Sequence, residues 1–176
     1  MLRAGRGDRA ACQALVERHL GRVVTFARRV LSNGDDAEDV AQEVFLRVWS
    51  AAPRWKRTAR FTTWLHRVAM NLCLDHLARK REVTGDDVPE PADPRPDPSA
   101  ALQAKDLAQH VQAALASLPE SQRIAITLCH HQGMRNIEAA DVMGVSVEAL
   151  ESLLARGRRA LGERLRPVGA ALLEEA

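Results

Sequence analysis

Four side chains with complementary chemistry follow one another in the middle of the chain. Their spacing of four, three and four residues places them on one face of a helix. They are Arg60, Trp64, Arg67 and Asn71. A guanidinium group neutralises phosphate, an indole ring stacks on an unpaired base, and a carboxamide can bond to a base edge. This combination is typical of a surface for single-stranded nucleic acid, although Trp64 by itself is explained equally well as a core residue.

The segments on either side of this face are also basic. A loop just before it combines three cations with a second indole ring, in the order Arg54, Trp55, Lys56 and Arg57. A core position explains this loop less well than nucleic acid binding does. Arg79, Lys80 and Arg81 follow the face. They fit either contacts with a duplex backbone or a solvated helix end that complements the helix dipole.

An earlier segment, residues 36–49, is predicted to be a helix with two faces. Small and branched apolar residues repeat at the spacing of a buried stripe: Ala37, Val40, Ala41, Val44 and Val48. A second stripe is polar and includes one leucine: Asp39, Gln42, Glu43 and Leu46. This second stripe is interpreted either as a docking surface for another protein or as an ordinary solvated face.

Helical periodicity and breaking residues predict the elements that position these side chains. Helices are expected at about 10–31, 36–50 and 61–80, with turns at 32–36 and 52–60. The segment 84–99 carries five prolines, several acids and almost no large apolar residues, so it cannot pack a core. We therefore expect an extended, flexible linker there. Further helices are expected at about 100–116, 119–131, 136–143 and 147–165.

The last two of these helices are typical of a helix-turn-helix. A short helix, the turn Gly144-Val145-Ser146 and a longer helix follow one another, and Ser146 is a suitable N-cap. Arginines are concentrated in the longer helix and beyond it, which favours DNA binding by this part of the chain.

Composition supports a helical protein without a catalytic site. Hydrophobic residues make up 46% of the 176 residues but aromatic residues only 3%, so the core must consist mostly of Leu, Val and Ala, as in packed helices. Three widely spaced cysteines indicate reduced thiols and a cytoplasmic location.

No catalytic triad, phosphate-binding loop or metal-ligand spacing is present, and Cys129-His130-His131 lacks further ligands. We expect no enzyme activity, cofactor or metal.

The order of these motifs resembles the extracytoplasmic-function (ECF) sigma factors of the sigma-70 family. Residues 36–45 and 61–71 are similar to sigma region 2, and Leu118-Pro119 with the helix-turn-helix is similar to region 4. The resemblance implies an all-α protein of two small helical domains. It predicts region 2 at residues 1–84, the linker at 85–99 and region 4 at 100–176.

The resemblance also implies roles for these residues. Core RNA polymerase would bind region 2 through its clamp helices, at Asp39, Gln42, Glu43 and Leu46. The −10 promoter element would contact a larger set: Arg54, Trp55, Lys56, Arg57, Arg60, Trp64, Arg67, Asn71, Arg79 and Lys80. The −35 element would contact region 4, which also packs on the polymerase flap, at Ser152, Arg156, Arg158 and Arg159. An anti-sigma factor is a further expected partner, and membrane insertion is not expected.

One feature departs from the family pattern. The recognition helix has Glu151 and Leu153 where relatives often carry basic residues, so these two are not predicted to contact DNA. The expected function is that of an alternative sigma factor for a stress or signal regulon. Two alternatives stay open: a sigma-like mimic that titrates an anti-sigma factor, and a stand-alone helix-turn-helix repressor. The first has no need of base-capturing residues, and the second would bind duplex DNA without polymerase.

Overall fold

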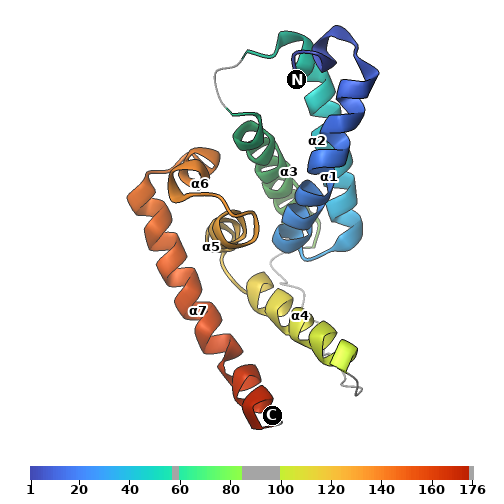
Figure 1. Ribbon diagram of the computed structural model, residues 1–176. Coiled ribbons are helices and arrows are strands. Elements are labelled where there is room, and N and C mark those ends of the chain that lie inside the picture. The colour runs from blue at the N-terminus through green and yellow to red at the C-terminus, as the bar shows by residue number, and fades with distance from the viewer. Residues whose placement is uncertain (57–59, 85–99, 175–176) are drawn as a thin grey trace.

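The computed structural model describes residues 1–56, 60–84 and 100–174, in which all regular structure is helical (Figure 1). The N-terminal half consists of α1 (Arg9–Leu31), α2 (Gly34–Ala51) and α3 (Phe61–Thr84). Two short 3-10 turns, η1 (Ala4–Arg6) and η2 (Ala52–Arg54), lie beside each other at one end of these helices. The predicted all-α fold is confirmed. None of the described helices is both long and apolar enough to cross a membrane.

Side-chain caps fix where the first two helices begin. Asp8 accepts a hydrogen bond from the amide of Ala11 (3.0 Å) at the start of α1. Asn33 accepts one from the amide of Asp35 (2.9 Å) at the start of α2. Each bond satisfies an amide that the helix itself leaves unpaired. Between the two helices, Ser32 adopts a left-handed conformation (φ 59°), which turns the chain back on itself.

The predicted apolar stripes pack these three helices together. Val40, Val44 and Val48 of α2 are buried against α1 and α3. On α3, Leu65 and Leu72 are buried, while Phe61 and Val68 are half-buried at the edge of the core. The buried side of each helix leaves its polar side on the surface, which is how the fold presents the candidate binding residues.

The C-terminal half contains α4 (Ala100–Ala116), α5 (Glu120–Ile126), α6 (Asn136–Met143) and α7 (Val147–Glu174). The predicted helix at 119–131 is α5 followed by a wider π-helical turn, η3 (Thr127–His131). The prediction that the last helix ends near residue 165 was wrong, because α7 continues through Pro167. Pro167 is exposed, and its ring nitrogen removes only one backbone hydrogen-bond donor from the helix. The helix therefore continues past this proline.

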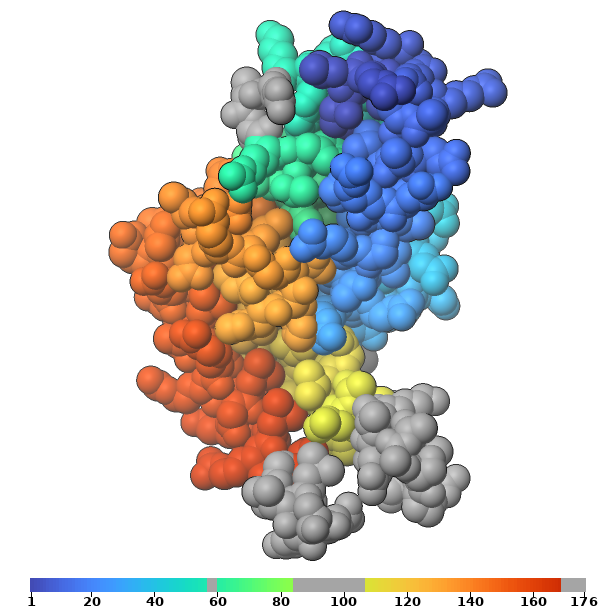
Figure 2. All heavy atoms as spheres, viewed as in Figure 1, coloured from blue at the N-terminus to red at the C-terminus, as the bar shows by residue number. Residues whose placement is uncertain are grey.

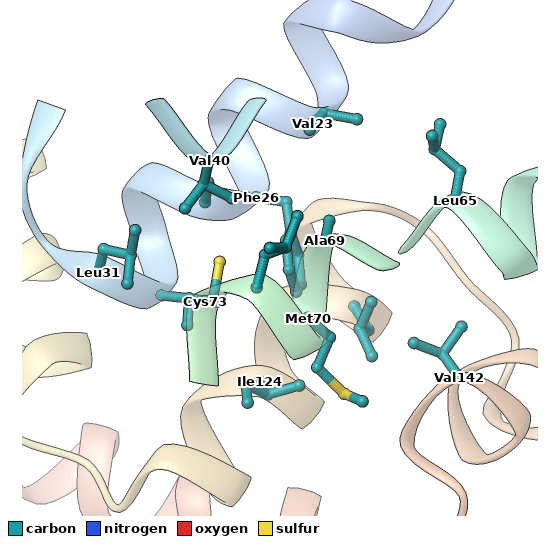
Figure 3. Packing of buried hydrophobic residues seen from close by; sticks show 14 of the residues in the cluster. Val23, Phe26, Leu31, Val40, Leu65, Ala69, Met70, Cys73, Ile124 and Val142 are labelled. Atoms are coloured by element: carbon teal, nitrogen blue, oxygen red, sulfur yellow. The ribbon is translucent and has the colours of Figure 1, made fainter. Parts of the chain in front are cut away.

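The two halves pack against each other through a continuous apolar core. Met70 and Cys73 of α3 lie close to Ile124 of α5, and Val142 of α6 borders the same cluster (Figure 3). The space-filling view shows the C-terminal half lying directly against the N-terminal half (Figure 2). The predicted linker, residues 85–99, falls outside the described residues.

Candidate nucleic-acid interface and docking surface

The polar face of α2 is open to solvent. Asp39 and Gln42 are exposed, and Leu46 is 59% exposed although it is a large apolar residue. Glu43 is half-buried and accepts a hydrogen bond from Nε of Arg47 (3.0 Å) on the next turn. A single exposed leucine is common on protein surfaces, so the docking role of this face stays a prediction.

The aromatic residues of the predicted −10 surface form one cluster. The Trp55 ring meets Trp64 edge-on, with centroids 5.1 Å apart, and meets Phe61 in the same way at 5.8 Å. Both indoles are half-buried, so Trp64 is neither a fully buried core residue nor a free stacking platform. Edge-to-face contacts hold the rings in fixed orientations while part of each surface stays accessible.

An open hollow of about 1020 Å³ adjoins this cluster. Trp55, Arg60 and Phe61 line one side, and Leu15 and Arg18 of α1 line another. Aromatic walls with arginines at the rim suit a base together with its phosphate. Arg18 was not predicted from the sequence, because it precedes the basic loop that begins at Arg54 by 36 residues and no local pattern connects the two.

The cations around the cluster differ in their surroundings. Arg54 and Lys56 are exposed on the loop, whereas Arg57 lies outside the described residues. At the far end of α3, Arg79 is exposed and donates to the carbonyl of Asp75 (3.3 Å). Lys80 has its Nζ 3.9 Å from a carboxylate oxygen of Asp36, at the start of α2.

The helical face of α3 is only partly free. Asn71 is exposed, as predicted for a residue that contacts a base. Arg60 and Arg67 are also exposed on this face, but each is paired with an acid of α6. Nη1 of Arg60 lies 2.6 Å from a carboxylate oxygen of Glu138, and Nη2 of Arg67 lies 2.8 Å from one of Asp141. Arg67 also donates to the carbonyl of Asp141.

A partly buried polar network between the two halves was not predicted. Nη2 of Arg22 donates to the carbonyl of Gln132 (2.7 Å), and Nε2 of Gln132 donates to the carbonyl of Arg22 (3.1 Å). Nε2 of His66 lies 3.3 Å from Oε1 of Gln132, and Nδ1 of His66 lies 2.8 Å from the carbonyl oxygen of Thr62. Burial lowers the pKa of His66, which favours the neutral ring. The network therefore joins α1 and α3 to the C-terminal half.

Arg123 of α5 is a second buried polar residue between the halves. Its Nη1 donates to the carbonyl of Ala116 (3.2 Å), the last residue of α4, and burial lowers its pKa. Cys73 of α3 is close enough for Arg123 to act on it electrostatically, yet burial prevails and raises the pKa of Cys73 to about 12. This thiol is therefore an inert core group.

The predicted helix-turn-helix is present as α6, a tight turn and α7. Gly144 has a positive φ of 68°, the conformation that a glycine allows at a helix end. Ser146 accepts a hydrogen bond from the amide of Ala149 (3.2 Å) and so begins α7. The four predicted −35 residues are exposed on α7: Ser152, Arg156, Arg158 and Arg159.

The two residues of α7 that depart from the family pattern, Glu151 and Leu153, both contact other parts of the chain. Glu151 accepts a hydrogen bond from Nδ2 of Asn136 (3.1 Å), which joins α7 to the start of α6. Leu153 is half-buried and packs against the core. Both side chains therefore contact other parts of the C-terminal half: Glu151 bonds to α6, and Leu153 packs on the core.

The Cys129-His130-His131 segment lies in the π-helical turn η3. Cys129 is half-buried, with its Sγ 3.9 Å from Oδ1 of Asn136, and burial raises its pKa. Within the described part of the chain, no three His, Cys, Asp or Glu residues come together as metal ligands would.

Comparisons with known proteins identify both halves. The family model for sigma-70 region 2 matches residues 15–83, and the model for sigma-70 region 4 matches residues 108–161. The chain is 31% identical to the RNA polymerase sigma-H factor of Pseudomonas aeruginosa, over 99% of this chain and 94% of that protein. It is 30% identical to the ECF RNA polymerase sigma-E factor of Escherichia coli, over 94% and 92%. It is also 35% identical to the ECF sigma factor SigE of Mycolicibacterium smegmatis, but spans only 64% of that protein.

Solved structures agree with this assignment. CnrH, in complex with the cytosolic domain of CnrY, superposes with a TM-score of 0.72 at 29% identity over 94% of both chains. The sigma factor RpoE of Bartonella quintana, in complex with the anti-sigma factor NepR, shares the fold with a TM-score of 0.73 at 24% identity, over 88% of this chain and 96% of that one. The chain therefore belongs to the sigma-70 family of RNA polymerase sigma factors, within its ECF group.

Proposed function

We propose that this chain is an alternative sigma factor that binds core RNA polymerase and directs it to a limited set of promoters. The observation that carries the proposal is the presence of region 2 and region 4, in that order, on one chain. We assign polymerase and −10 binding to residues 1–84, the connecting linker to 85–99 and −35 binding to 100–176. In this role the chain binds polymerase and positions it on promoter DNA, without catalysing a reaction itself. Because bacterial promoter DNA lies in the cytoplasm, we assign the protein to the cytoplasm.

The polar face of α2 is the proposed docking site for the clamp helices of polymerase. Asp39, Gln42 and Leu46 are exposed together on this face, and Glu43 lies at its edge. Leu46 supplies apolar area for the contact, while the carboxylates and the amide determine orientation and partner. Access to this face requires no rearrangement of the described residues.

The aromatic cluster and its cations are the proposed −10 surface. The set comprises Arg54, Trp55, Lys56, Arg57, Arg60, Trp64, Arg67, Asn71, Arg79 and Lys80. Extruding a base from the duplex costs a few kcal/mol, and stacking on an indole with hydrogen bonds to an exposed amide offsets a cost of that size. The fixed orientation of Trp55 and Trp64 supports this role, because rigid rings lose little conformational freedom when a base binds.

The recognition helix α7 is the proposed −35 reader. Ser152, Arg156, Arg158 and Arg159 are exposed along it, and arginines in the major groove contact both guanine and phosphate. Glu151 is bonded to Asn136 and is left out of the proposed DNA contacts.

An anti-sigma factor is the proposed regulator. A structural relative, RpoE of Bartonella quintana, was solved in complex with the anti-sigma factor NepR. A partner that covers the α2 face or the α3 face of this chain would block polymerase or promoter binding, because both faces are needed for initiation.

Transcription in vitro tests the proposal. Purified core polymerase is combined with this protein and with fragments of the source genome, including the region upstream of its own gene. We expect transcripts whose start depends on this protein and disappears with the variant Asp39→Ala/Gln42→Ala. Binding to an anti-sigma factor without any dependent transcript would instead indicate a sigma mimic. Specific binding to duplex DNA without polymerase would indicate a repressor.

A further inference from the structure

The α3 face proposed for promoter DNA already holds acidic side chains from the other half of the chain. Arg60 is paired with Glu138, and Arg67 with Asp141, at nitrogen–oxygen distances of 2.6 and 2.8 Å. Glu138 and Asp141 are three residues apart on α6, so one helical face presents both carboxylates. Their partners are seven residues apart: Arg67 lies in α3 and Arg60 directly precedes this helix, in line with the same face. Two rows of opposite charge therefore face each other.

The same polarity extends beyond these two pairs. Arg81, near the end of α3, lies 2.9 Å from a carboxylate oxygen of Glu120 at the start of α5. In all three pairs the arginine lies in α3 or directly before it, and the acid belongs to the C-terminal half. A surface that binds phosphates is thus matched by carboxylates from within the same molecule.

This ionic contact surrounds an apolar centre. Met70 of α3 and Val142 of α6 are buried within the shared cluster, and the Arg22–Gln132 bonds lie beside it. An apolar centre with a polar rim is the usual anatomy of a specific protein interface. The pairs at the rim are exposed: the side chains of Arg60 and Arg67 are 71% and 45% accessible. Such pairs are weak and are screened by salt, so the two arginines can exchange a carboxylate for a phosphate at little cost.

We propose that α6 is a built-in competitor for promoter DNA, in which the carboxylates of Glu138 and Asp141 occupy the guanidinium groups that would otherwise bind phosphate. The free chain is then closed and binds the −10 element poorly, and engagement with polymerase separates the halves and releases Arg60 and Arg67. This inference rests on the proposed −10 role of these two arginines.

The test variant removes the two charges and keeps the shapes, as Glu138→Gln/Asp141→Asn. Glutamine at 138 can still accept from the amide of Arg135, as Glu138 does at 3.3 Å, so the start of α6 is preserved. The matched control is Glu148→Gln/Glu163→Gln, which changes the net charge by the same amount at exposed positions of α7. Thermal unfolding by circular dichroism confirms that both variants fold.

The first measurement is the radius of gyration of the full chain by small-angle X-ray scattering at 50 mM and 500 mM salt. We expect the test variant to be more expanded than wild type at 50 mM, and wild type to expand as salt rises. The control should match wild type. The charge-swapped variant Arg67→Glu/Asp141→Arg should be as compact as wild type, whereas Asp141→Arg alone should be expanded. Equal radii for the test variant, Asp141→Arg and wild type would overturn the proposal.

The second measurement is the affinity of the free chain for a fluorescein-labelled single strand that carries the −10 element of a promoter mapped by transcription. At 50 mM salt we expect the test variant to bind about tenfold more tightly than wild type, and the control to change by less than about twofold. Expansion without a gain over the control would overturn competition with DNA. Failure of the proposed function is seen separately, as absence of any transcript from wild type with core polymerase.

Discussion

On α2, Asp39, Gln42 and Leu46 are exposed to solvent, whereas on α3 each of Arg60 and Arg67 already contacts a carboxylate of α6. The two proposed binding faces belong to the same three-helix unit and differ in whether something occupies them. A polymerase can reach the first face without any change in the chain, but DNA can pair with Arg60 and Arg67 on the second only after their contacts with α6 break. The difference implies an order of events, with polymerase first and promoter second.

The largest expected effect concerns the open face. Asp39→Ala/Gln42→Ala should weaken binding to core polymerase by about 100-fold, because central interface residues carry most of the binding energy. Both side chains are exposed, so thermal unfolding should be nearly unchanged. Fluorescence anisotropy of labelled protein with core polymerase measures the affinity. If the affinity for core polymerase is unchanged but promoter opening is lost, the α2 face contacts DNA rather than polymerase.

The second effect is expected on the occupied face. Asn71→Ala should slow promoter opening by about 10- to 30-fold, since a lost base contact typically removes 1–3 kcal/mol of discrimination. Affinity for core polymerase should stay at the wild-type value. Permanganate footprinting of unpaired thymines measures opening. Trp64→Phe is a useful companion, because it keeps the packing on Phe61 but reduces the stacking surface. Weakened polymerase binding in Asn71→Ala would show that this residue belongs to the docking face instead.

The third effect tests the support of the aromatic loop. A Cβ on Gly5 would overlap the carbonyl oxygen of Ala52 in η2, which directly precedes the Trp55 loop. Gly5→Ala should therefore destabilise the N-terminal half by about 1–3 kcal/mol and impair opening more than polymerase binding. Differential scanning calorimetry should show a melting temperature several degrees lower.

Gly21→Ala provides the control for this change. A Cβ on Gly21 meets no atom within 4 Å in the middle of α1, and alanine there should stabilise the helix by about 0.5–1 kcal/mol. Equal melting temperatures for the two variants would contradict the close approach of η1 and η2.

The smallest effect is a dependence of stability on pH. Burial lowers the pKa of His66, so the folded chain binds fewer protons than the unfolded chain, whose histidine titrates near about 6.5. The neutral ring contributes fully to the free energy of unfolding above that pH. As the pH falls below it, the free energy of unfolding decreases by at most about 1.4 kcal/mol per pH unit. Urea unfolding at pH 7.5 and 5.0 measures the difference. His66→Gln should show a smaller difference, and an equal one would show that other groups are responsible.

Much of the fold follows from local sequence signals. The helix Asn136–Met143 was predicted with its correct bounds, because Gly144 and Ser146 end one helix and begin the next. The end of α7 was missed, since a single exposed proline has less influence than the packing and length of a long helix. Local signals therefore predict the end of a helix well where a capping residue is present. They predict it poorly where the only signal is a helix-breaking residue such as proline.

The contacts between the halves could not be predicted in this way. Arg22 and Gln132 are 110 residues apart, and Arg60 and Glu138 are 78 apart, so no periodicity connects them. The same holds for the bond between Glu151 and Asn136, which are 15 residues apart on different helices. Residue types and spacing predicted two candidate binding faces, whereas only the structure showed that Arg60 and Arg67 on one of them are paired with acids of α6.

The distribution of tryptophan gives the protein a built-in optical readout. The chain has three tryptophans and no tyrosine, so its ultraviolet emission comes from Trp49, Trp55 and Trp64. Trp55 and Trp64 are in contact on the proposed −10 surface, and Trp49 lies against Phe45 on α2, the proposed docking helix. The variant Trp49→Phe confines the emission to the proposed −10 surface. Unlabelled protein can then report the arrival of a nucleobase as quenching, in real time and without any attached dye.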